Sequence, residues 1–117
     1  MKTTAARRSG THKETFRGGK VAAAGRFTDG KRSGIWKYYF RNGRVKATGR
    51  FSRGRLEGVW KWYRENGGLL QVGAFRGGKQ VGRWVRYDLK GKLYDTRKFV
   101  DGVQVGAAIR AKGRGRA

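Results

Sequence analysis

The sequence predicts an all-β protein, a single elongated antiparallel meander of hairpin repeats. Three observations lead to this prediction. Aromatic residues and glycines recur at a fixed spacing of 24 residues. Within each unit, apolar and polar residues alternate, which is the period of a strand. Glycines bracket each run and proline is absent, which suits an unbroken ladder of backbone hydrogen bonds. We expect about eight strands with basic flexible tails.

The repeat is visible in many columns at once. The clearest columns are Phe27, Phe51, Phe75 and Phe99; Gly34, Gly58, Gly82 and Gly106; Trp36, Trp60 and Trp84; and Tyr39, Tyr63 and Tyr87. A leading half unit is present as well, because Gly19 and Val21 lie one period before Gly43 and Val45. Such regularity indicates successive copies of one supersecondary unit.

The elements follow from the alternation and the turn residues. The expected strands cover residues 20–28, 35–41, 44–52, 59–65, 68–76, 83–88, 92–100 and 106–110. Asn42-Gly43 and Asn66-Gly67 predict tight hairpin turns with two positive φ residues. The connections equivalent to Asp29–Gly34 predict longer loops. These bounds divide the chain into a basic extension at 1–18, a repeat domain at 19–110 and a basic tail at 111–117.

Strand parity predicts one aromatic and one basic side of the sheet. The first side is expected to hold Val45, Ala47, Gly49, Phe51, Trp60 and Trp62, and the other Lys46, Arg50 and Lys61. Glycines 25, 49 and 73 leave room for a Trp ring of the next strand to lie across the backbone. The Trp column is therefore expected to be structural.

The columns form the pattern G-x-F-x-x-G-x-x-x-G-x-W-x-x-Y-x-x-x-G-x-[VL]. This pattern resembles the MORN repeat family, in particular its bacterial variant form with antitoxin-like annotation, over about residues 19–106. The resemblance implies an elongated antiparallel meander and a scaffold for protein or lipid contact. The last unit departs from the pattern, since Ala108 stands in place of Trp.

The charge of the chain implies a polyanionic partner. Thirty Lys and Arg against seven Asp and Glu give a formal charge of +23, and such self-repulsion disfavours the compact state. Nucleic acid is the expected partner because basic side chains release its condensed counterions. An anionic membrane surface is a second candidate. No apolar run approaches membrane-spanning length, so we expect a cytoplasmic protein without integral membrane association.

Recurring cations are the candidate nucleic-acid-binding residues. In the repeats they are Arg26, Arg50 and Lys98 on strands, Lys37 and Lys61 between the aromatics, and Lys31, Arg55 and Lys79 in loops. In the tails they are Arg7, Arg8, Lys13, Arg17, Lys20, Arg110, Lys112, Arg114 and Arg116. Equivalent cations are expected in rows with a step of about 10 Å, the width of two strands. Tyr39, Tyr63 and Tyr87 are candidates for base stacking.

The sequence offers little to an enzyme. Cysteine is absent, His12 is the only histidine, and the seven acids form no recurrent pair. No phosphate-binding loop precedes a helix. We therefore expect no catalysis, no metal, no cofactor and no small-molecule ligand.

The favoured function is a non-catalytic RNA-binding subunit of a ribosome or other ribonucleoprotein, in contact with other proteins of a large assembly. Eighteen Arg against twelve Lys favour RNA over DNA, since guanidinium groups stack on bases and fork onto phosphate. The alternatives are a DNA-packaging protein and a protein-interaction scaffold of the antitoxin or virion kind. A single-layer meander exposes its apolar face unless another surface covers it, and this favours the protein-interaction scaffold.

Overall fold

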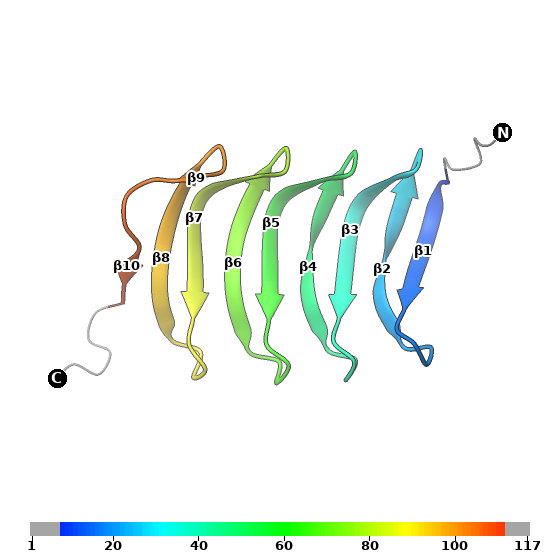
Figure 1. Ribbon diagram of the computed structural model, residues 1–117, viewed down its shortest axis with the longest axis horizontal. Coiled ribbons are helices and arrows are strands. Elements are labelled where there is room, and N and C mark those ends of the chain that lie inside the picture. The colour runs from blue at the N-terminus through cyan, green and yellow to red at the C-terminus, as the bar shows by residue number, and fades with distance from the viewer. Residues whose placement is uncertain (1–7, 112–117) are drawn as a thin grey trace.

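The computed structural model describes residues 8–111 as one open antiparallel sheet, 65 × 35 × 18 Å in extent (Figure 1). The strands are β1 (Gly10–Thr15), β2 (Val21–Thr28), β3 (Lys31–Tyr39), β4 (Val45–Ser52), β5 (Arg55–Tyr63), β6 (Leu69–Arg76), β7 (Lys79–Tyr87), β8 (Leu93–Val100), β9 (Val103–Gln104) and β10 (Ile109–Arg110). From β1 to β8 each strand pairs with the next in sequence, and β9 and β10 both pair with β8. The expected meander of hairpin repeats is confirmed.

The tight turns lie at the other end of the hairpins from the end that we predicted. Asp29-Gly30 and Arg53-Gly54 each join two strands directly, and all four residues have positive φ, which is the two-residue turn that matches strand twist. The strands after these turns therefore begin at Lys31 and Arg55, several residues earlier than expected. No long loop separates these pairs of strands.

The Asn-Gly pairs occupy longer connections, between Tyr39 and Val45 and between Tyr63 and Leu69. Here only the glycine has positive φ. Asn42 Oδ1 accepts a hydrogen bond from the Arg44 amide at 2.9 Å, so the asparagine caps the backbone two residues on and keeps negative φ. The prediction of a tight turn at Asn-Gly was wrong for this reason.

Bulges bend the strands. Between β2 and β3 the register changes at Ala24 and Arg26, and Gly34 takes a φ of 68° inside β3, which a residue with a side chain adopts only with strain. Between β3 and β4 the pairing passes from Tyr38↔Ala47 to Tyr39↔Val45. Bulges of this kind increase the local twist, and the strands in Figure 1 are visibly curved.

The bulge at Lys46 corrects the predicted faces. Lys46 has no partner in the β3–β4 register and lines a depression with Ala47 and Trp60, whereas Val45 lines another with Lys37. We had placed Lys46 on the basic side and Val45 on the aromatic side. The extra residue of the bulge reverses the alternation at this point.

A strand that was not predicted, β1, lies within the expected N-terminal extension. It pairs with β2 through His12↔Gly25 and Lys13↔Ala24. Its residues lack the bulky apolar alternation of the other strands, so it was read as part of a flexible tail. The repeat spacing does identify it, because Gly10 lies 24 residues before Gly34 and Lys13 lies 24 before Lys37.

The core is a ladder of aromatic rings on one side of the sheet, here called the aromatic face, the side of Trp36, Trp60 and Trp84. Trp36 is fully buried and Trp60 and Trp84 nearly so. A Cβ added at Gly25 would lie 2.1 Å from the Trp36 ring, so the indole lies directly on the glycine backbone. The same relation joins Gly49 to Trp60. The predicted structural role of the Trp column is confirmed.

Edge-to-face contacts extend the ladder along the sheet. The rings of Phe27 and Trp36 are 5.4 Å apart at 86°, and those of Phe51 and Trp60 are 5.2 Å apart at 85°; this geometry suits the ring quadrupoles. The ladder ends at β8, where Arg97 is the partner of Trp84. Arg97 stands where the earlier units have glycine, and Ala108 stands where they have Trp, so the two departures occur together.

Candidate nucleic-acid interface

The other side of the sheet, here called the basic face, is the side of Lys37 and Lys61. Lysines alternate with small residues across it in one row, in the order Lys13, Ala24, Lys37, Thr48, Lys61. The lysines lie on β1, β3 and β5, and all are exposed. Their step across the sheet is two strand widths, about 10 Å. The expected row of cations is present and extends onto β1.

A second row lies beside the first on even-numbered strands. Arg50 on β4 pairs with Ile35 and Glu57, and Lys98 on β8 pairs with Arg83. Arg26 occupies the same position on β2. Arg83 belongs to this row but not to the predicted set, and it replaces the exposed apolar residues Ile35 and Val59 of the earlier units. The sequence does indicate Arg83, because it is a cation at a repeat position that holds an apolar residue in the earlier units.

The ion pairs of the described residues lie on the aromatic face. Arg32 Nη2 is 3.1 Å from Glu14 Oε2, and His12 Nε2 is 3.8 Å from the same oxygen. Arg86 binds Asp95 through two hydrogen bonds of 3.1 and 2.9 Å. These bonds hold the pKa of Asp95 below its ordinary value, although burial of the carboxyl opposes the shift.

The basic face keeps one acid on its strands in the described part of the chain. This acid is Glu57, opposite Arg50, and its Oε1 accepts a hydrogen bond from the Gly77 amide at 2.9 Å. The remaining acids lie in turns, at Asp29, Glu65, Asp88 and Asp101. Positive charge on this face is therefore largely uncompensated by the protein itself.

Cations also follow both ends of the strands. At the two-residue turns, the stem of Lys31 lies against the next turn, since a Cβ at Gly54 would be 3.5 Å from the Lys31 Cβ. Arg55 and Lys79 repeat this contact with Gly78 and Gly102. The predicted loop cations thus form a regular row along one edge of the basic face.

At the opposite strand ends, Lys20 and Arg17 lie in the connection from β1 to β2. Lys20 Nζ donates to the Arg41 carbonyl at 3.5 Å. Arg41, which the sequence analysis missed, places its guanidinium 4.6 Å from the centre of the Phe16 ring. Its signal was available, because Arg17 and Arg41 are one period apart.

Some predicted residues lie away from the basic rows. Arg8 lies 4.5 Å from the centre of the Phe27 ring, and Arg110 lies 4.5 Å from that of Tyr94. Both cations are thus on the aromatic face. Arg7, Lys112, Arg114 and Arg116 lie outside the described residues.

The three candidate stacking residues are half-buried at strand ends. Tyr63 lines a depression with Lys37 and Thr48 of the basic face. Tyr39 and Tyr87 line depressions that contain aromatic-face residues, Trp60 and Arg86 respectively. Of the three rings, Tyr63 shares a depression with a residue of the lysine row.

No cluster of three or more His, Asp or Glu side chains is placed to hold a metal between residues 8 and 111. Over this range, no helix is long and apolar enough to cross a membrane.

The comparison with known families identifies the repeat. Residues 32–52 and 56–75 match the MORN repeat variant model, and these segments contain Lys37, Arg50, Lys61 and the Trp36 and Trp60 rings. No curated protein matches the chain. The chain thus carries MORN-type repeats of the variant kind, and the matched units lie in the most regular part of the sheet.

Proposed function

We propose that this protein is a non-catalytic RNA-binding subunit of a ribonucleoprotein, such as a ribosome, in the cytoplasm. The observation that carries the proposal is the uncompensated basic face. Cations stand in register across strands there, whereas the ion pairs Arg32–Glu14 and Arg86–Asp95 lie on the aromatic face. A face of one sign, with a formal charge of +23 for the chain, suits a polyanion.

The shape of the basic face supports an extended ligand. The Lys13, Lys37 and Lys61 row crosses the strands, and the Lys31, Arg55 and Lys79 row runs beside it at the turns. A phosphate backbone laid along either row would meet a cation about every 10 Å. Contacts of this kind position a nucleic acid without reading its bases.

RNA is favoured over DNA by the excess of Arg over Lys, since guanidinium groups stack on unpaired bases as well as binding phosphate. Tyr63 offers one aromatic ring near the lysine row. A DNA-packaging protein would use the same surface, and treatment with RNase or DNase distinguishes the two roles.

A second candidate, a protein-interaction scaffold, is favoured by one observation. At the C-terminal edge, Val100, Val103 and Ile109 are 59%, 66% and 70% exposed. Exposed apolar residues that lie close together often mark a contact with another protein. A subunit of a large assembly would use both surfaces, with RNA on one face and protein at this edge.

The test is sedimentation of the protein from its own cells, at low and high salt, with and without RNase or DNase. The proposal expects co-sedimentation with a large particle that is lost on RNase treatment or at high salt, because phosphate contacts weaken steeply with salt. Release by DNase alone would move the function to DNA packaging. Binding to a single protein that survives both nuclease treatment and high salt would contradict the proposal and favour a protein-interaction scaffold.

A further inference from the structure

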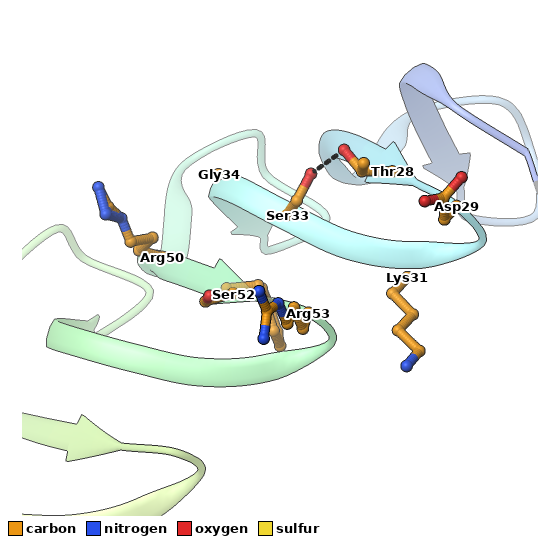
Figure 2. A pocket seen from close by; sticks show the side chains of 9 residues that line it. Thr28, Asp29, Lys31, Ser33, Gly34, Arg50, Ser52 and Arg53 are labelled. Carbon is orange, nitrogen blue, oxygen red and sulfur yellow. Dashed lines mark hydrogen bonds between the residues drawn. The ribbon is translucent and has the colours of Figure 1, made fainter.

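A groove lies between two successive two-residue turns on the basic face, Asp29-Gly30 and Arg53-Gly54 (Figure 2). Its lining includes the side chains of Thr28, Ser33 and Ser52. Its volume is about 680 Å³, within the range of about 300–1,000 Å³ typical of small-ligand pockets. A phosphate group with its flanking sugars therefore has room there.

Equivalent positions of the repeat show which kind of group binds the first backbone amide of a two-residue turn. In the first three units, the residue at position 9, 33 or 57 lies near the first amide of the next two-residue turn, whereas the fourth unit has Val81 there, which offers no side-chain acceptor. Ser9 Oγ accepts a hydrogen bond from the Asp29 amide at 3.0 Å. Glu57 Oε1 accepts one from the Gly77 amide at 2.9 Å. An oxygen acceptor thus fills this point in the units on either side.

The middle unit leaves the point open. Ser33, the equivalent of Ser9 and Glu57, instead shares a 2.8 Å hydrogen bond with Thr28 Oγ1 (Figure 2). Over residues 8–111 the structure shows no acceptor for the Arg53 amide. Arg53 lines the groove, and its backbone N–H has no protein acceptor there among the described residues.

The surroundings select an anionic oxygen. Lys31, Arg50 and Arg53 line the groove, with Asp29 as the one acid among the lining residues. Figure 2 shows Asp29 at its own turn, apart from Ser52 and Arg53 on the neighbouring turn. In the next unit the point is held by the Glu57 carboxylate, an anion supplied by the protein. An amide flanked by cations and hydroxyls is a typical phosphate-binding arrangement.

We infer that this groove binds one phosphate group of the RNA backbone, with the Arg53 amide, the Ser33 hydroxyl and the surrounding cations as its donors. That the phosphate belongs to RNA rests on the proposed function. That the groove binds an anion rests only on the donors and cations that line it. The Glu57 carboxylate marks where the phosphate oxygen lies.

The repeat supplies a matched pair of variants. Ser33→Glu is expected to place a carboxylate on the Arg53 amide, as Glu57 does on Gly77, and so to occupy the site. Glu57→Ala is expected to free the Gly77 amide, which follows Arg76 in the chain and lies next to Gly78, against which the stem of Arg55 packs, creating a second site. Lys90→Gln is the control, because it lowers the net charge by as much as Ser33→Glu but lies in the connection from β7 to β8, outside both the groove and the basic rows.

The experiment follows backbone amide resonances of the full-length protein during titration with inorganic phosphate against chloride at constant ionic strength, and then with a short single-stranded RNA. We expect a saturable shift of the Arg53 amide with both probes. The shift should be lost in Ser33→Glu and kept in Lys90→Gln, and Glu57→Ala should gain one at Gly77. Ser33→Glu should also weaken RNA binding by about 10-fold, the equivalent of one charged hydrogen bond.

An Arg53 amide that does not respond to phosphate would overturn the inference even if RNA still bound the lysine row. A response to phosphate but not to RNA would overturn the assignment to an RNA backbone, and a response to vesicles rich in anionic lipid would then give a membrane as the source. A wild-type protein that does not bind RNA at all would instead contradict the proposed function.

Discussion

At the scale of single residues, the fold depends on three glycines that have no conformational need for glycine. Gly25, Gly49 and Gly73 have ordinary φ but lie under the Trp rings of the next strands. This requirement was predictable, because the glycine and Trp columns share one spacing and adjacent strands bring them together. Any side chain at these positions must displace an indole.

We therefore expect Gly49→Ala to destabilise the protein. The new Cβ would lie 2.2 Å from the Trp60 ring, and overpacking of this kind typically costs about 1–3 kcal/mol. Urea unfolding measures the loss. The double variant Gly49→Ala with Trp60→Leu should lose less than the sum of the two single variants; strict additivity would show that the ring and glycine are not in contact.

Asp95 gives a pH-dependent prediction. Its pKa lies below the ordinary value because of the hydrogen bonds from Arg86, so the folded state binds its proton less readily than the unfolded chain. The resulting stability is present above the unfolded pKa, about 3.9, and is lost as pH falls through the lower folded pKa.

Unfolding free energies of wild type and Asp95→Asn, measured from neutral to strongly acidic pH, test this. The wild type should be the more stable at neutral pH, and the difference should shrink on acidification below the unfolded pKa. A difference that stays constant with pH would show that the Asp95 carboxylate charge does not contribute.

At the scale of elements, the sequence predicted the strands β2 to β8 and their order but not the turns between them. The two-residue turn at Arg53-Gly54 was missed because Arg rarely takes positive φ, whereas Asp29-Gly30 carries the Asp-Gly pair that favours such a turn; both residues of each pair have positive φ. Asn42 was misread because its side chain could serve either turn type, and the Arg44 amide that it caps becomes visible only in the structure.

The strand β1 is expected to be part of the folded domain. His12 takes the place of Trp in the repeat, and its ring contacts that of Phe27 edge to face, with centres 5.1 Å apart. Deletion of residues 1–15 would uncover Phe27 and make β2 an edge strand.

We expect that deletion to lower the stability by about 1–3 kcal/mol, the range for exposing one large apolar side chain. Thermal unfolding followed by circular dichroism measures it, with deletion of residues 1–7 as the control. Equal melting temperatures for the two deletions would contradict a structural role for β1.

At the scale of the whole molecule, the sheet is a single curved layer with different faces. The charge pattern was predictable, because the cation columns and the Trp columns have opposite parity on the strands. The groove at Arg53 was not predictable, since it depends on which way the Ser33 hydroxyl turns and on the hydrogen bond to Thr28.

The formal charge of +23 should make stability depend on salt. Like charges repel more strongly in the compact state than in the expanded chain, and this repulsion is screened when the Debye length falls from about 30 Å at 0.01 M to about 8 Å at 0.15 M. The melting temperature should therefore rise as sodium chloride is added over this range. A flat or falling melting temperature would show that the charges are compensated within the fold.

The most direct test of the account is the salt dependence of RNA binding by the purified protein, measured by fluorescence anisotropy. The variant Lys37→Gln, Arg50→Gln, Lys61→Gln removes basic-face charge, and the control Lys46→Gln, Lys90→Gln, Lys92→Gln removes the same charge elsewhere. The account predicts that the slope of log affinity against log salt becomes shallower by about 2 in the first variant, at about 0.7 per phosphate contact, and changes less in the control. Equal changes in both variants, or salt-independent binding, would contradict an RNA interface on the basic face.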